Sequence, residues 1–455
     1  MATHAAWLKR KVCMNSEINS RSSRRRLRTF WLALAIIVLG VAVSGLWQNR
    51  KADRQLDAIR NAGYPVTLAE LNEWYAFPAG ENAAFKILEA VSQLSAPVGS
   101  YNGETPLAPE IRDEMQRFWT NNQAAFALAH HAAGIKECRF LVDLNQGANV
   151  LLPHLSQIKQ LVQQLRNVAI LHSEEGRLEL ALQSYRDALA IAQSLGPEPL
   201  LISQLVRIAC VMIAQSGLEK ILARHELTEA QIDALSAALR DAESRGRPAF
   251  TRSLAGERCL AIHAFRMPPT QFIRLMDPNA GRGPTLGFSA LYAVTKITGL
   301  RSRDFSFYRL MMQEWIACSE LPFPTALEKT KETDLRLAAG LQGFSRFLRP
   351  LSGMLLPALQ KALAKEAACS ASIRCAQTAL AVERHRLQNQ GQLPESLDAL
   401  VPQLIASVPQ DPFDGRPLRY KMLEKGYVVY SVGSNGKDDD AVTQGSLDIA
   451  FRVER

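Results

Sequence analysis

The sequence predicts a mainly α-helical protein with a single N-terminal transmembrane helix and a small C-terminal α+β module. Three observations predict this fold class. An uncharged apolar run covers residues 30–47. Apolar residues recur at the spacing of helix faces from about residue 48 to residue 390. Alternating apolar residues, typical of half-buried strands, occur only near the C-terminus. The 455 residues are enough for two or three domains.

The run from Phe30 to Trp47 is long enough to cross a bilayer. Its 18 residues, at about 1.5 Å of rise each, nearly match a hydrocarbon core of about 30 Å. Trp31 and Trp47 lie near its ends, where indole rings favour the headgroup level. A cleaved signal peptide with a site at 42–44 is the alternative, but apolar cores of signal peptides usually have about 7–15 residues. We expect an uncleaved anchor.

The positive charge of the chain is concentrated before this run. Residues 1–28 hold eight basic residues and one acid, whereas the rest holds 45 basic and 43 acidic residues. A basic segment beside a span is expected on the cytoplasmic side. We therefore predict a cytoplasmic tail at 1–29, a single span at 30–47 in the cell (inner) membrane, and an extracytoplasmic body. Nucleic-acid binding would need Lys and Arg clustered on a folded face, and the balanced body argues against it.

The seven cysteines are scattered and form no Cys-x-x-Cys pair. Structural zinc sites need closely spaced Cys and His ligands, so no zinc site is expected. We interpret the cysteines as small buried apolar residues. A long-range disulfide is the alternative if the body lies in an oxidising compartment.

Helices are predicted directly after the span. Residues 48–63 favour a charged helix, and Thr67 followed by Glu70 has the pattern of a capping box. Residues 81–94 are again helical in pattern. After a loop at 95–108, apolar residues recur at helical spacing up to about residue 133.

The clearest local pattern is a helical hairpin at 154–194. Two apolar stripes at helical spacing flank a tight break at 174–177. The small and large residues of this hairpin resemble the signature of a tetratricopeptide helix pair, at Gly176, Ala181, Tyr185 and Ala188.

The following segments continue the hairpin rhythm without that signature. Helices are predicted at 198–224 and 227–244, and Thr228 with Gln231 forms a second capping-box pattern. We predict helical hairpins over 154–244, with a generic helical bundle as the alternative. Further helices at 249–266, 306–319 and 324–345 and a connector at 267–305 complete an extracytoplasmic helical domain at 48–350.

The last part of the chain is predicted to be an α+β module at 359–455. A long helix extends to about Gln390, and two alternating segments, Pro417–Leu423 and Gly426–Val432, flank a short turn. Residues 447–453 alternate strictly, as in a third strand. A helix followed by a small antiparallel sheet is an α+β layout.

The order of short motifs in this module is specific. After the helix come Leu393-Pro394, then Asp411-Pro412-Phe413-Asp414-Gly415, and then Tyr427 to Gly436. This order resembles the C-terminal half of the major pseudopilins of type II secretion, over about residues 370–440. The resemblance implies a calcium loop between Ser431 and Asp440, and the candidate calcium ligands are Ser431, Asp438, Asp439 and Asp440.

The chain also departs from the pseudopilin pattern. Asn435 stands where the family has an aspartate, and a solvated acidic turn is the alternative to a calcium loop. The prepilin peptidase site of the family is absent at the span, which opens with residues 27–32 as Leu-Arg-Thr-Phe-Trp-Leu. We therefore do not expect this chain to be processed and polymerised as a pilin.

The sequence holds neither His-Glu-x-x-His nor Gly-x-Ser-x-Gly. The leading functional hypothesis is a membrane-anchored, non-enzymatic interaction or scaffold protein with unknown envelope partners. The second is an accessory component of a type II secretion or pilus-like assembly. The third is an envelope hydrolase with a site assembled from distant residues. A continuous apolar or charged concave face would favour the scaffold hypothesis. Calcium geometry at 431–440 would favour the secretion hypothesis. A groove lined by buried titratable groups would favour the hydrolase hypothesis.

Overall fold

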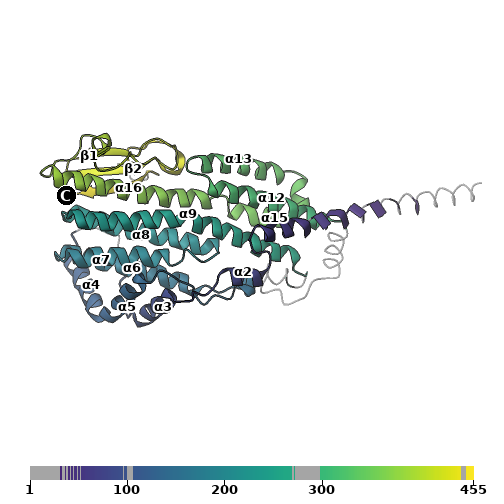
Figure 1. The fold of residues 1–455 in the computed structure, drawn as a ribbon, viewed down its shortest axis with the longest axis horizontal. Helices are drawn as coiled ribbons and strands as arrows, with labels where there is room; N and C mark the ends of the chain where they lie inside the picture. The colour runs from purple at the N-terminus through teal and green to yellow at the C-terminus, as the bar shows by residue number, and fades with distance from the viewer. Residues whose placement is uncertain are drawn as a thin grey trace, which may run out of the picture.

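The computed structural model describes residues 31, 32, 36, 39, 40, 43, 44, 46–48, 50, 51, 53–95, 97–99, 106–268, 271, 298–441 and 447–455. The chain is mainly helical with a three-stranded antiparallel sheet near its C-terminus, as the sequence predicts (Figure 1). The predicted tail at 1–29, most of the connector at 267–305 and part of the predicted span at 30–47 lie outside the described residues.

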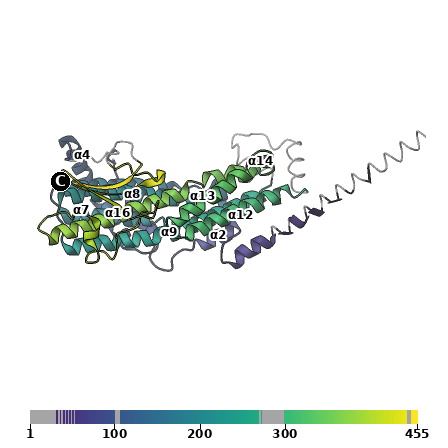
Figure 2. The ribbon, with the colours of Figure 1, turned by 90° about the horizontal axis from the view of Figure 1, so that it is seen from above.

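The described residues of the predicted span are helical, and their apolar side chains are exposed. The exposed fractions lie between 57% and 69% for Trp31, Leu32, Ile36, Leu39, Val43, Leu46 and Trp47. Figure 2 shows this N-terminal helix extending away from one end of the helical body. Residues 53–61 continue as a helix that packs on the body through Leu56 and Ile59.

Four short helices follow: α2 (Leu68–Trp74), α3 (Ala83–Gln93), α4 (Pro109–Asn121) and α5 (Gln123–Gly134). Thr67 caps α2 as predicted, since its hydroxyl accepts a hydrogen bond from Glu70 N. The helical pattern predicted from residue 109 to 133 is present as two helices, which divide at Asn122. The Asn122 carboxamide accepts from Ser95 N at 2.7 Å and donates to Phe118 O at 2.8 Å, which ties the end of α4 to the preceding loop.

The predicted hairpin at 154–194 is present as α6 (Pro153–Glu174) and α7 (Leu178–Gln193), with Gly176 in the left-handed conformation at the turn. The next helix, α8 (Leu201–Arg224), packs against both α6 and α7. By length and composition α8 is the one described helix that could cross a membrane, but 61% of its apolar window is buried within the protein. Its burial is that of a core helix.

The predicted helices at 227–244 and 249–266 are one helix, α9 (Glu229–Arg266), with Pro248 inside it. The capping box of Thr228 and Gln231 starts this helix as predicted. A proline inside a helix costs about 3 kcal/mol. Tertiary contacts offset this cost: Arg247 donates to Ser319 O, and Phe250 and Leu254 are buried directly after the proline. The expected break is therefore wrong.

A second layer of helices covers the half of α9 nearest the N-terminal helix. It consists of α12 (Leu300–Glu320), α13 (Thr325–Gly340), α14 (Ser345–Leu348), α15 (Pro350–Leu355) and the short 3₁₀ turn Leu356–Ala358. α12 packs on α9, and α13 and α15 pack on α12. Side chains of this layer join residues of α9 and of the segment 56–66 in one hydrophobic cluster.

The long helix α16 (Ala362–Gln388) packs against α8 and α9, where the next helix of a hairpin array would lie (Figure 1). The sheet then covers α16 and part of α8. Its strands are β1 (Arg419–Leu423), β2 (Gly426–Ser431) and β3 (Ile449–Glu454), in the order β1-β2-β3. In register, Tyr420 pairs with Val429, and Val429 pairs with Phe451.

The main hydrophobic cluster extends from α2 through α8 to α16 and the sheet. All six described cysteines are buried and free, in agreement with the expectation of small buried residues. The hairpins and the C-terminal sheet thus share one core.

Candidate functional site

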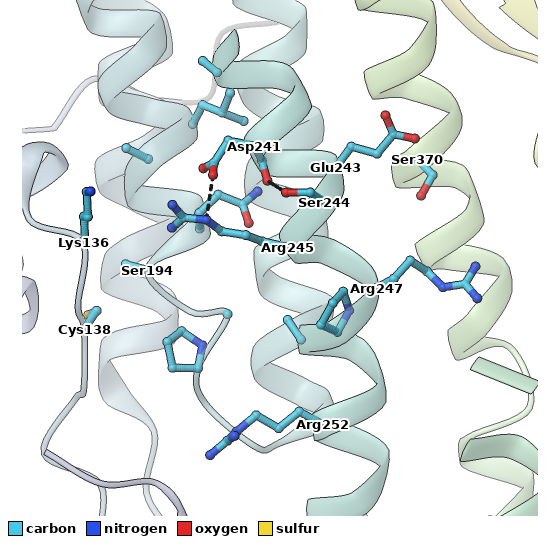
Figure 3. A pocket seen from close by; sticks show the side chains of 18 of the residues that line it. Lys136, Cys138, Ser194, Asp241, Glu243, Ser244, Arg245, Arg247, Arg252 and Ser370 are labelled. Carbon is cyan, nitrogen blue, oxygen red and sulfur yellow. Dashed lines mark hydrogen bonds and ion pairs between the residues drawn. The ribbon is translucent and has the colours of Figure 1, made fainter. Parts of the chain in front are cut away.

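A pocket of about 1310 Å³ crosses the middle of α9 (Figure 3). One side is formed by α3, α5, α7 and the extended segment 135–138, and the other side by the end of α12 and by α16. The labelled side chains in Figure 3 run from Lys136 and Cys138 on one side, over Asp241 and Arg245 of α9, to Ser370 of α16. The pocket is therefore an elongated groove open to solvent.

Two local features hold the walls of this groove. The segment 135–138 is fixed by Asn82, which donates to Arg139 O and accepts from Arg139 N, each at 2.9 Å. The turn after α7 lies directly against α9, because Gly256 has no side chain and a Cβ there would collide with Pro199 O. Backbone contacts therefore fix the positions of the segment 135–138 and of the turn after α7.

Two arginines of α9 hold neighbouring segments in place. Arg247 donates to Ser319 O and Leu321 O and lies 4.0 Å from the centre of the Phe323 ring. Arg252 donates to Trp74 O and lies 3.8 Å from the centre of its ring. Burial lowers the pKa of both guanidinium groups, but a guanidinium remains protonated at neutral pH. These two cations are engaged with the protein itself.

Other charges of the groove are exposed. Arg245 pairs with Asp241 at 3.0 Å, and Arg374 pairs with Glu243 at 2.7 Å. Lys136 and Arg186 are exposed, and within the described chain neither makes a hydrogen bond or an ion pair. Two cations on the same side of the groove are therefore available for an anionic group.

Gln193 of α7 lines the same groove as these cations. It is 8% exposed, and neither its amide nitrogen nor its amide oxygen has a partner among the described residues. A buried polar atom without a partner costs about 1–3 kcal/mol. The Gln193 carboxamide therefore becomes a donor and an acceptor for a molecule in the groove when its side chain turns toward that molecule.

The Cys138 thiol, Ser194 and Ser244 line the groove without a described histidine beside them. Burial raises the pKa of the Cys138 thiol to about 12, against an opposing hydrogen bond with Ser194, so the thiol is not ionised at neutral pH. Ser194 donates to Ile191 O, and Ser244 donates to Asp241 O. No histidine is among the described residues that line the groove.

A buried polar cluster lies behind the turn after α7, around Glu198. His154 Nε2 lies 2.9 Å from Glu198 Oε2, and Ser203 Oγ donates to Glu198 Oε1 at 2.5 Å. Both groups bind the same carboxylate, so the imidazole does not lie between the serine and the acid as a general base would. All three side chains are almost fully buried. The cluster joins α6, α8 and the turn before α8.

The structure does not bring the four candidate calcium ligands together. Ser431 is buried and donates to Asp411 Oδ1, whereas its neighbour Tyr430, on the opposite face of β2, donates to Asp438. Asp439 accepts from Asn435 Nδ2, and Asp440 lies 3.7 Å from Lys421 Nζ. Across the described ranges, no group of three or more His, Cys, Asp or Glu residues is arranged to hold a metal ion.

Asp411 is the centre of the turn that the resemblance singled out. This buried carboxylate accepts hydrogen bonds from Ser431 Oγ, Val432 N and Phe413 N, at 2.8 to 2.9 Å, and pairs with Arg419 at 2.9 Å. It therefore joins the loop before β1 to the end of β2. The sequence motif has a structural role at this position.

No family model, curated protein or solved structure matches the chain. The groove residues also escaped sequence reasoning. Lys136, Arg186 and Gln193 come from an extended segment and from two positions of α7, and they form no local motif. Only the packing of α7 against the segment 135–138 places them in one groove.

Proposed function

We propose that this chain is a membrane-anchored, extracytoplasmic scaffold protein whose groove binds an extended, acidic segment of a partner protein. The observation that carries the proposal is one groove that combines the exposed cations Lys136 and Arg186 with the buried Gln193 carboxamide, which has no partner among the described residues. A peptide backbone supplies the N–H and C=O groups that such a carboxamide binds. Acidic side chains complement the two cations.

The apolar part of the groove supports a peptide over a small ion. The partly exposed residues Ala133, Ile135 and Ala190 line one side, and an elongated surface of apolar and cationic groups suits an extended chain. Arrays of helical hairpins present surfaces of this kind to peptides. A nucleic acid is not proposed, because the basic and acidic residues of the body nearly balance.

Catalysis is a weaker proposal for the same groove. A hydrolase would need a nucleophile beside a base, but the described lining contains no histidine, burial keeps the Cys138 thiol protonated, and Ser194 and Ser244 donate to backbone carbonyls. The buried cluster of Glu198, His154 and Ser203 has the carboxylate in the middle. Binding is therefore the function that this geometry favours.

The membrane anchor is part of the proposal. The described residues of 30–47 are helical with exposed apolar side chains, which water would not solvate well. The basic residues at 1–28 support a cytoplasmic N-terminus in the cell membrane. The groove then lies outside the cytoplasm, where envelope proteins are its candidate partners.

The test uses the full-length protein in lipid nanodiscs and two fluorescent peptides, one of Glu, Pro and Ala and its counterpart with Lys in place of Glu. We expect anisotropy to rise with the acidic peptide only. The double variant Lys136→Glu/Arg186→Glu should abolish the rise. Arg240→Glu, an exposed charge reversal on α9 outside the groove, should leave it unchanged. Equal binding of both peptides, or equal loss in both variants, would overturn the proposal.

A second candidate function, an accessory role in a secretion or pilus-like assembly, is favoured by the C-terminal module. The support is the pseudopilin resemblance of the sequence motifs, together with β1, which is an edge strand to which a partner strand can add. The implied calcium loop is tested by thermal unfolding in calcium and in chelator. If the second candidate is correct, calcium raises the midpoint temperature of thermal unfolding, and this increase is absent in Asp438→Asn.

A further inference from the structure

Exposed apolar side chains gather at the end of the body from which the N-terminal helix extends. They lie on the segment 344–354, which contains α14 and α15: Phe344 is 76% exposed, Leu348 37% and Met354 46%. Figure 2 shows α14 at the same end of the molecule as the N-terminal helix.

A chain of hydrogen bonds connects this segment to the N-terminal helix. Arg303 Nη2 donates to Ser44 Oγ at 3.3 Å. The next residue, Asp304, accepts from Leu351 N at 3.0 Å and from Ser352 N at 3.2 Å. The start of α15 is therefore fixed, through two neighbouring side chains of α12, to a point three residues before Trp47.

The charges at this end suit a lipid headgroup region. Arg303 and Arg346 are exposed, and Lys51 Nζ lies 5.4 Å from the centre of the Trp47 ring. Arginine and lysine at the end of a span extend toward the headgroups while their carbon chains cover apolar surface. Apolar side chains beside such cations are the composition of a segment that lies in the membrane interface.

We propose that residues 344–354 form a second membrane contact that lies flat in the outer interface of the same bilayer that the N-terminal helix crosses. This inference rests on the proposed membrane anchor. The second contact fixes the tilt of the body, because a single span alone leaves the tilt of the anchor, and of the body packed on it, free to vary. The groove on α9 is then held at a constant orientation to the membrane surface.

The test places one fluorescent label at a time on the full-length protein in vesicles of phosphatidylcholine and phosphatidylglycerol. Cys13 is replaced by serine, and the six other cysteines are buried. An environment-sensitive nitrobenzoxadiazole label is attached at Leu348→Cys, at Ile36→Cys in the anchor, or at Leu387→Cys. Leu387 is the matched control, since it is 45% exposed and lies at the far end of α16. The quenchers are lipids spin-labelled at the headgroup or in mid-chain.

We expect the Leu348→Cys label to shift to the blue and to be quenched by headgroup spin labels, and the Leu387→Cys label to show neither change. Quenching at Ile36→Cys by mid-chain labels without quenching at Leu348→Cys would overturn the second contact and leave the anchor standing. Absence of quenching at Ile36→Cys would overturn the anchor and this inference with it. A Leu348→Asp variant should release the body, which is read as loss of quenching at a label on Met354→Cys.

Discussion

Arg207 of α8 and Glu366 of α16 form an ion pair with 2.6 Å between Nη2 and Oε2, and both side chains are buried. Gly246 of α9 lies against the same pair, where a Cβ would approach Glu366 Oε1 to 2.7 Å. The pair therefore lies at the junction of three helices.

Removing one partner of this pair should strongly destabilise the fold. Glu366→Ala leaves the Arg207 guanidinium buried without a counter-charge, and we expect the free energy of unfolding to fall by about 3–5 kcal/mol. Asp241→Ala breaks an exposed ion pair with Arg245. This substitution should change the free energy of unfolding by about 0.5 kcal/mol or less. Urea unfolding of both variants, followed by circular dichroism, checks the difference. An equal decrease in the free energy of unfolding in both variants would show that the buried pair contributes no more to stability than the exposed pair.

Asp411 should control the order of the loop that follows β2. Asp411→Asn keeps the size of the side chain but loses the charge that pairs with Arg419 and one acceptor oxygen. We expect a loss of about 2–3 kcal/mol of stability and faster proteolysis within 432–441. Glu424→Gln, an exposed substitution in the β1–β2 turn, is the control. Unchanged proteolysis in Asp411→Asn would contradict the role of this carboxylate.

His172 should make the protein sensitive to mild acid. The ring is buried beside Trp119, and neither nitrogen has a partner in the described structure. Burial, with a smaller effect of Arg177, lowers the pKa of His172 to about 4. Below the unfolded pKa of about 6.5 the unfolded chain binds a proton that the folded chain does not. Stability therefore falls as the pH decreases from about 6.5 to about 4, by roughly 3 kcal/mol in total.

The measurement compares urea unfolding of the native protein and of His172→Phe across this pH range. The variant should lose the part of the pH dependence that belongs to this residue and gain relative stability at low pH. His131→Gln, at an exposed histidine, should keep the native pH dependence. Parallel curves for native protein and His172→Phe would show that another group causes the acid sensitivity.

Gln193 should affect binding and stability in opposite directions. Gln193→Leu removes two buried polar atoms that have no partner among the described residues, so the free energy of unfolding should rise by about 1 kcal/mol. The same variant should bind the acidic peptide more weakly. Paired urea unfolding and anisotropy measurements test this. A loss of stability would indicate that the carboxamide supports the fold and not a ligand.

Local patterns predicted much of the fold because they involve neighbouring residues. Thr228 and Gln231 are three apart and start α9 as expected. The alternation of residues 447–453 corresponds to β3, in which Phe451 and Val453 are buried. Capping boxes and strand alternation can therefore be identified without knowing where distant residues lie.

Other features depend on contacts between distant segments. Pro248 looks like a helix end in sequence, but Arg247 and Phe250 hold the helix through it. Asn122 looks helical, but its bonds to Ser95 divide the helix. The groove also depends on distant segments, because Lys136 and Gln193 line one groove only after α7 and the segment 135–138 have come together. The sequence alone could not place them together.

The position of α16 has a consequence for synthesis of the chain. α16 covers surface that α8 and α9 leave open, yet α12 to α15 are translated before it. In the proposed topology the hairpins therefore cross the membrane with an uncovered apolar side, which remains available to chaperones or to aggregation until α16 has followed them. A chain truncated before residue 362 should be retained by chaperones outside the cytoplasm, whereas a chain that includes α16 and the sheet should be released.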